Sequence, residues 1–361
     1  MLPTLNPPLV SFCTPTYNRP EYLRRVVESC LAQTYRHWEI VITDNSNNNE
    51  TANMVAKWTD PRIRYFSNGG NVGPAINSNR AFLMARGKYV QLLMDDDLIK
   101  PKFLERMVAA FEKNPTVGVV MAPMELIDAE DRRIFPKFYV FRTMHHRYRY
   151  QVGDGLIERK RVLRDFLTRD YPCCVPSGIL YRAEALRFDP AAEAVRRMPF
   201  DPANEAWRLP LPFDPAADFA GDLLMSMKIA AQWDFYYIDE GLSSWRFIPV
   251  GHTAKIHKTG LKISVFYDVT RQVLALEPVQ EMFRDEWDKL KRDSLFFCTC
   301  RAVMLNGLAA MRARSLKLLL DTIKTVCKQD PYLTNHLRLP FWAMNQIWVS
   351  IFPPKLPPPR E

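Results

Sequence analysis

The chain has 361 residues, of which 47% are hydrophobic, so it is long enough for one large domain or two ordinary domains with a sizeable core. This composition excludes a disordered chain. The net charge of +9 suits an anionic partner, which leaves a phosphate-bearing substrate, an anionic membrane surface and nucleic acid open. The first eight residues lack the basic and apolar regions of a secretory signal. The seven cysteines have no metal-site spacing, so we expect reduced thiols in a cytoplasmic protein.

Strands and helices are predicted to alternate over roughly residues 1–125. Helices are expected from Pro20, near residues 50–58, over 75–85 and after Pro101. Apolar runs that predict strands lie at residues 9–14, 39–43, 62–66, 89–94 and 117–122. This alternation is typical of an α/β fold with a doubly wound, mostly parallel sheet.

Three consecutive carboxylates, Asp95, Asp96 and Asp97, follow the apolar strand predicted at residues 89–94. In an open α/β sheet, ligands bind beyond the carboxyl ends of the strands. Adjacent carboxylates repel one another, so a hard cation such as Mg²⁺ or Mn²⁺, carrying substrate phosphates, is a natural partner. The alternative is a solvated turn that caps the next helix.

Polar clusters end two further predicted strands, at residues 14–19 and 44–49. Three such strand ends are the arrangement expected of a nucleotide site. Neither the dinucleotide-binding glycine pattern nor the P-loop pattern is present, so a cation would have to neutralise the phosphates. Most of the asparagines after Asp44 are turn formers, whereas Asp44 itself directly ends a strand and could accept a hydrogen bond from a base or ribose.

Four sequence blocks resemble the successive blocks of family 2 glycosyltransferases. They are Ser-Phe-Cys-Thr-Pro-Thr-Tyr-Asn-Arg from residue 11, Ile-Val-Ile-Thr-Asp-Asn-Ser from 40, Asn-Val-Gly-Pro-Ala-Ile-Asn-Ser-Asn-Arg from 71 and Leu-Leu-Met-Asp-Asp-Asp-Leu-Ile from 92. The family comprises inverting enzymes of GT-A fold that use nucleotide-diphosphate sugars. The resemblance therefore implies a GT-A-like sheet and a metal-assisted transfer of a sugar.

The resemblance also assigns residues to this expected site. It implies that the nucleotide sugar is bound by Thr14, Pro15, Tyr17, Arg19, Asp44, Asn79, Arg80 and Asp95, with Tyr17 and Asp44 near the base. Asp96 is expected on the metal. Met94 stands where the family often has the first Asp of Asp-x-Asp-Asp, so the resemblance leaves open whether Asp96, Asp97 or both hold the cation.

The second half of the sequence carries a separate carboxylate. Asp222 begins an apolar helical pattern, where an acid is favoured by the helix dipole and where a plain capping role is the alternative. The segment resembles the family's Glu-Asp block, in which the Asp is the general base, although Gly221 replaces the Glu. Arg246 and His252 follow a strand that resembles the last strand of the family's catalytic domain, and from there they could reach the diphosphate or the metal.

We expect residues 1–125 to form the nucleotide-sugar half, 126–250 the acceptor half and 251–361 a helical C-terminal extension. The tail from Pro353 is predicted to be disordered. No apolar window reaches 18 residues without a charge. The basic amphipathic helices leave open a peripheral position on the cytoplasmic face of an anionic membrane.

The sequence thus predicts a metal-dependent inverting glycosyltransferase that acts on a hydroxyl acceptor, either a saccharide or a lipid-linked saccharide. Asp222 would be its general base. The departures at Met94 and Gly221 favour an alternative, a non-catalytic binder of sugar nucleotides or glycans with the same fold. A nucleic-acid binder is a second alternative, but no RRM, KH or zinc-finger pattern supports it.

Overall fold

A computed structural model of the protein describes residues 7–134, 153–169, 175–186, 214, 217, 220–248 and 264–330, without the side chains of 304–305, 307–309 and 311–313. His252 lies outside the described residues, and so does the tail from Pro353.

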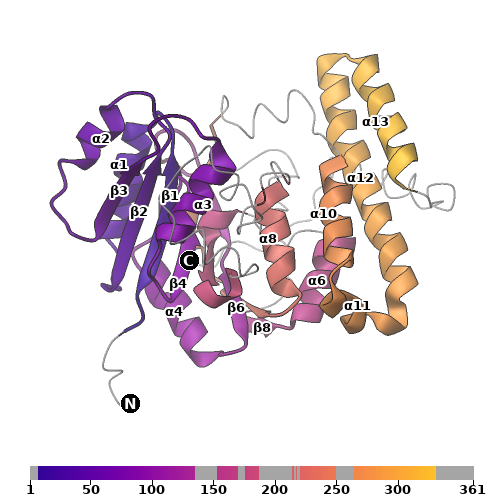
Figure 1. Ribbon diagram of the computed structural model, residues 1–361, viewed down its shortest axis with the longest axis horizontal. Helices are drawn as coiled ribbons and strands as arrows, with labels where there is room; N and C mark the ends of the chain where they lie inside the picture. The colour runs from indigo at the N-terminus through magenta and orange to yellow at the C-terminus, as the bar shows by residue number, and fades with distance from the viewer. Residues whose placement is uncertain are drawn as a thin grey trace.

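An eight-stranded sheet forms the centre of the molecule (Figure 1). In the order of the sheet, its strands are β3 (Ile63–Ser67), β2 (Trp38–Asp44), β1 (Val10–Thr16), β4 (Tyr89–Leu92), β9 (Ile179–Arg182), β6 (Val117–Met121), β10 (Asp234–Tyr237) and β8 (Gly155–Ile157). Strands β3, β2, β1 and β4 run parallel to one another, and β6 is parallel to β10. Strand β9 is antiparallel to β4 and β6, and β8 is antiparallel to β10. The mostly parallel sheet confirms the predicted fold class.

A second, three-stranded sheet lies beside the first. It consists of β5 (Leu98–Ile99), β11 (Ser243–Arg246) and β7 (Met124–Ile127), with β11 in the centre. Strand β5 follows the three aspartates directly. This sheet therefore holds the chain at the C-terminal end of the acidic segment.

Helices cover both faces of the large sheet, as a doubly wound fold requires. One core contains side chains of α1 (Pro20–Leu31), α2 (Glu50–Val55) and α4 (Phe103–Lys113). The other contains side chains of α3 (Pro74–Met84), α6 (Arg159–Thr168), α8 (Gly221–Ala230), α10 (Ser264–Leu274), α11 (Glu277–Met282) and α12 (Trp287–Ala313). Helix α13 (Leu316–Gln329) packs on α12, so the C-terminal helical extension is also confirmed (Figure 1). Short 3₁₀ turns occupy Pro176–Gly178, Ala183–Leu186 and Arg284–Glu286.

Two predicted boundaries were wrong. Strand β4 ends at Leu92 instead of Met94, because the Met94 N–H bonds the Ser177 hydroxyl at 3.1 Å and leaves the ladder. Helix α4 begins at Phe103, two residues after the expected Pro101. The acidic segment is consequently held in a loop between β4 and β5.

Gly87, just before β4, lies against Ser11 of β1. A Cβ atom there would lie 2.6 Å from the Tyr89 carbonyl oxygen and 2.7 Å from the Ser11 nitrogen, both of which are backbone atoms. We expect Gly87→Ala to lower the free energy of unfolding by roughly 2 kcal/mol or more, because the two strands must separate. Denaturant unfolding measures this loss.

Gly241→Ala is the matched control, since its added Cβ would meet only Glu125, at an ordinary 3.6 Å. Equal stability of the two variants would contradict the tight contact at Gly87.

None of the helices in the described part of the chain is long and apolar enough to span a membrane.

Candidate functional site

The ends of β2, β1 and β4 bring polar side chains from three distant segments to one edge of the sheet. Thr16 ends β1 and pairs in register with Asp44, which ends β2. The Thr16 hydroxyl donates to Asp95 Oδ2 at 2.8 Å, and the Asn45 N–H donates to the Thr16 carbonyl at 3.0 Å. Thr16 thereby links the acidic segment after β4 to the loop after β2.

Arg19 pairs with two of the three aspartates. Its Nη1 lies 3.2 Å from Asp95 Oδ1 and 2.7 Å from Asp96 Oδ2. About a third of the Arg19 side chain is exposed, whereas Asp95 is nearly covered and Asp96 retains 18% exposure. One guanidinium therefore neutralises part of the negative charge at this edge.

The acidic segment holds more negative charge than its surroundings compensate. Burial, and then the neighbouring charge of Asp96, raise the pKa of Asp95 to about 6, against the lowering effect of Arg19. Burial also raises the pKa of Asp96, although Arg19 and Arg246 oppose it. Asp97 is fully buried, and its pKa is raised well above the usual value by burial and by Asp96. An additional positive charge would stabilise the ionised forms of these carboxylates.

Arg246, at the end of β11, forms hydrogen bonds with the acidic segment. Its backbone N–H donates to Asp97 Oδ1 at 2.9 Å, and its Nε donates to the Asp96 carbonyl at 2.7 Å. The guanidinium also contacts the Asp128 carbonyl and the Asp131 carboxylate, and its side chain has no exposed surface. The structure thus places Arg246 behind Asp96, so its expected contact with the nucleotide sugar stays a prediction.

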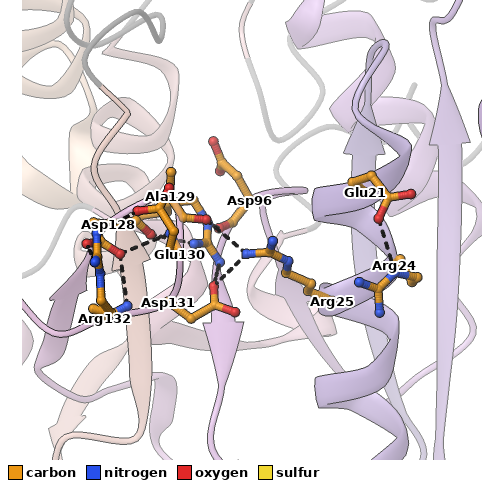
Figure 2. A network of polar contacts seen from close by, with 10 residues as sticks. Glu21, Arg24, Arg25, Asp96, Asp128, Ala129, Glu130, Asp131 and Arg132 are labelled. Atoms are coloured by element: carbon orange, nitrogen blue, oxygen red, sulfur yellow. Dashed lines mark hydrogen bonds and ion pairs between the residues drawn. The ribbon is translucent and has the colours of Figure 1, made fainter.

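The turn at residues 128–132, which Arg246 contacts through Asp128 and Asp131, also bonds helix α1. Figure 2 shows the turn beside Arg25 of α1. Arg25 of α1 donates to the Ala129 carbonyl at 2.9 Å and to Asp131 at 3.1 Å. Arg132 pairs with Asp128 at 2.8 Å within the turn. Figure 2 shows Asp96 beside this network, which therefore fixes one side of the acidic segment.

Asp44 is almost fully buried at the end of β2. One carboxylate oxygen accepts the Ser46 N–H at 2.7 Å, and the other accepts the Tyr65 hydroxyl at 2.7 Å. Tyr17, which follows β1, is 41% exposed and is one of the few large exposed hydrophobic side chains in the described residues. An exposed aromatic ring at this edge of the sheet is a surface on which a base can stack.

A network of asparagine side chains that we did not predict joins the loop after β2 to the end of β1. Asn68 donates to the side-chain oxygens of Asn45 and Asn77 at 2.7 Å each, and Asn77 donates to the Thr16 carbonyl at 3.2 Å. All three side chains are buried. The prediction that most asparagines after Asp44 only form a turn therefore does not account for Asn45, which belongs to this network. The cluster of asparagines in the sequence was the only signal of such a network.

The remaining predicted residues are Thr14, Pro15, Asn79 and Arg80. Thr14 and Asn79 have no exposed surface, and Pro15 is also buried within β1. Arg80 of α3 donates to the Ser67 carbonyl at 2.7 Å and contacts Asn68, and burial lowers its pKa. Thr14, Pro15 and Asn79 therefore lie behind the edge of the sheet, whereas Arg80 lies at the end of β3, where Ser67 pairs with Asp44. The contact of all four with a ligand stays a prediction.

Asp222 lies in the first turn of α8, at the same edge of the sheet. Strand β9 is antiparallel to both β4 and β6, so β6 and its parallel neighbour β10 run in the direction of β4. Helix α8 leads into β10 and runs back along the sheet, which places its N-terminus at the carboxyl ends of these strands (Figure 1). No hydrogen bond or ion pair between described residues joins Asp222 to the acidic segment; its Oδ1 accepts the Leu223 N–H at 2.7 Å.

Asp222 is partly exposed. Its helix neighbours Leu223, Leu224 and Met225 are buried. Burial raises the pKa of Asp222 from the ordinary 3.8 to about 7, and the Leu223 N–H opposes this rise. A carboxylate with this pKa can take up a proton near neutral pH.

The family model for glycosyl transferase family 2 matches residues 11–188. This segment contains β1, β2, β4 and the acidic loop. Residues 11–188 belong to glycosyltransferase family 2. In this family 2 domain the sequence resemblance of the four blocks is therefore confirmed, and the resemblance of the Asp222 segment lies beyond the matched residues.

Relatives of the family 2 domain are found in archaea and bacteria. An uncharacterised glycosyltransferase of Methanocaldococcus jannaschii is 34% identical over 142 residues, which are 38% of this chain and 49% of the relative. The putative colanic acid biosynthesis glycosyl transferase WcaA of Escherichia coli is 35% identical over 106 residues, 29% of this chain and 38% of WcaA. The similarity thus spans about half or less of each relative.

The fold extends beyond the matched segment. TarS of S. aureus is similar with a TM-score of 0.58 and 16% identity, over 94% of this chain and 52% of TarS. TarS residues 1–349, in complex with UDP-GlcNAc, give a TM-score of 0.52 at 15% identity, over 90% of this chain and 93% of that chain. At this identity the likeness shows a shared GT-A-like fold.

Proposed function

We propose that the protein transfers a sugar from a nucleotide-diphosphate donor to a hydroxyl group of an acceptor, with inversion. The acceptor would be a glycan or a lipid-linked saccharide. The observation that carries the proposal is the convergence of Thr16, Asp44, Asp95 and Asp96 at neighbouring strand ends of a family 2 domain. This edge offers an exposed aromatic ring for a base and an excess of negative charge for a cation.

The acidic segment suits a divalent cation such as Mg²⁺ or Mn²⁺. Asp96 combines partial exposure with a raised pKa, whereas Asp97 is buried and bonded to the Arg246 backbone. We therefore assign Asp96 to the cation and a supporting role to Asp97. No described group of three or more His, Cys, Asp or Glu side chains is arranged to hold a metal ion. Mg²⁺ usually takes one or two carboxylates together with substrate phosphates.

The reaction divides into a proton transfer and a displacement. Asp222 takes the proton of the acceptor hydroxyl, and the freed oxygen attacks the anomeric carbon from the face opposite the diphosphate. The new C–O bond forms as the bond to the diphosphate oxygen breaks, and its electron pair leaves with the nucleoside diphosphate. A bound divalent cation supplies positive charge to that leaving group.

Arg19 supplies the positive charge next to Asp95 and Asp96 when no other cation is bound. We expect Arg19→Ala to tighten the binding of Mn²⁺ alone by about fivefold, because it removes a competing cation that is partly screened by solvent. Binding of a nucleoside diphosphate should weaken, since Arg19 is then also lost as a phosphate partner. Electron paramagnetic resonance of free Mn²⁺ measures the first effect, and calorimetry measures the second.

Arg24→Ala on α1 is the control, since Arg24 forms ion pairs with Glu21 and Glu28 of the same helix. Unchanged Mn²⁺ affinity in Arg19→Ala would show that Arg19 does not compete with the metal.

Slow hydrolysis of a sugar nucleotide tests whether the protein is an enzyme. Water can replace the acceptor, so the account predicts release of free sugar that requires Mn²⁺ and that stops in Asp222→Asn. A sugar-nucleotide or glycan binder without catalysis would bind the donor and release none. Salt-sensitive binding to single-stranded nucleic acid, with no binding of sugar nucleotides, would instead favour the nucleic-acid alternative.

A further inference from the structure

The outward face of α13 is apolar. Leu316, Leu319, Leu320 and Ile323 are 68%, 38%, 47% and 48% exposed. They are four of the six large hydrophobic side chains that are exposed in the described part of the chain. Contiguous exposed apolar side chains usually mark a surface that binds a partner or a membrane.

These four side chains form one stripe, which we call the α13 stripe. Their positions follow the i, i+3, i+4, i+7 spacing of a single helix face. The buried side chains of α13, Thr322 and Val326, lie on the face that adjoins the stripe, and Val326 packs with Ala302 of α12. The stripe is therefore not required to hold α13 on its own domain.

Lysines run along one edge of the stripe. At about 100° per residue, Lys317, Lys324 and Lys328 fall within roughly 40° of one another, next to Leu320. All three are exposed. The one other charged residue within α13 is Asp321. This edge therefore presents a net positive charge beside the apolar stripe.

We propose that α13 docks on the surface of an anionic lipid bilayer. The α13 stripe would enter the boundary between head groups and acyl chains, and the three lysines would reach lipid phosphates with their ammonium groups while their stems stay on the apolar surface. A second copy of the chain is a poorer occupant, because it would bring the same three lysines and only Asp321 to complement them.

The position of α13 fits a peripheral attachment. Figure 1 shows it at the end of the molecule opposite β2 and β3. Contact through α13 therefore leaves the ends of those strands uncovered. The proposed membrane docking goes beyond the proposed sugar transfer and does not depend on it.

Co-sedimentation of the full chain with lipid vesicles tests the proposal. We expect binding to phosphatidylcholine vesicles that contain phosphatidylglycerol, and weaker binding at high salt. The triple variant Leu316→Gln, Leu320→Gln, Ile323→Gln should lower the partition coefficient by roughly 100-fold or more. The triple variant Lys317→Gln, Lys324→Gln, Lys328→Gln should lower it by roughly 100-fold, about fivefold for each lysine.

Two matched controls keep the result specific. Leu156→Gln removes an exposed hydrophobic side chain from β8, and Lys57→Gln, Lys102→Gln, Lys113→Gln removes three exposed lysines from the N-terminal half. Both should leave vesicle binding unchanged.

Three results would overturn the proposal. The first is equal binding to neutral and anionic vesicles. The second is no vesicle binding together with a lower Tm of the apolar variant, which would mean that the stripe packs within the chain. The third is a dimer, seen by light scattering, that the apolar variant dissociates without any vesicle binding.

Discussion

Asp222→Asn is expected to lower the rate of sugar transfer by roughly 10²- to 10⁴-fold, because the acceptor hydroxyl loses its proton acceptor. Donor affinity should change little, since Asp222 has no described bond to the acidic segment that would hold the diphosphate. Steady-state kinetics and donor calorimetry separate the two effects. Lys228→Gln on the same helix is the control for a general disturbance of α8.

The pH dependence follows from the raised pKa of Asp222. A general base works in its ionised form, so the transfer rate should fall as the pH drops below about 7 and level off above it. Full activity of Asp222→Asn, or a wild-type rate independent of pH between about 5 and 9 (roughly two units either side of that pKa), would exclude Asp222 as the base.

Stability should respond in the opposite sense. The pKa of Asp222 is about 7 in the folded protein against an ordinary 3.8, so its ionisation costs stability as the pH rises from 3.8 through 7. We therefore expect Asp222→Asn to raise Tm at a pH above 7 and to leave Tm nearly unchanged below 3.8. A catalytic group kept at the expense of stability behaves in this way.

Asp96→Ala is expected to weaken Mn²⁺-dependent binding of a nucleoside diphosphate by roughly 100-fold, about 2.8 kcal/mol. Asp96 is the partly exposed member of the acidic segment, and its carboxylate contacts Arg19. Calorimetry with and without Mn²⁺ measures the loss. Asp268→Ala, an exposed acid on α10, is the control. If Asp96→Ala binds as tightly as the wild type, the cation is held elsewhere.

The order of the elements could be predicted where the sequence signal is local. Each buried strand from β1 to β4 is a short apolar run, and Pro20 begins α1 as expected. Asp44 and Asp95 could be placed at one edge because the carboxyl ends of parallel strands share it. These inferences need only periodicity and the direction of the strands.

The contacts across the chain could not be predicted in the same way. Strand β9, which begins at Ile179, lies between β4 and β6 in the sheet. Nothing in its local sequence indicates that these strands are its neighbours. The Asn77 bond to the Thr16 carbonyl joins residues 61 positions apart. The bonds of the Arg246 guanidinium to the Asp128 carbonyl and to Asp131 also join distant segments, and its expected contact with the nucleotide sugar stays a prediction. Such partners depend on packing that only the folded chain defines.

The most direct test of the account is a thermal-shift measurement of the intact chain with UDP, GDP, dTDP and CDP, each with and without Mn²⁺. The account predicts that one nucleotide raises Tm clearly when Mn²⁺ is present, since a ligand at 100 times its Kd adds about 2.7 kcal/mol of stability. The shift should disappear with EDTA and in Asp96→Ala. A Tm that no nucleotide changes under any of these conditions would contradict a nucleotide-sugar site at the ends of β1, β2 and β4.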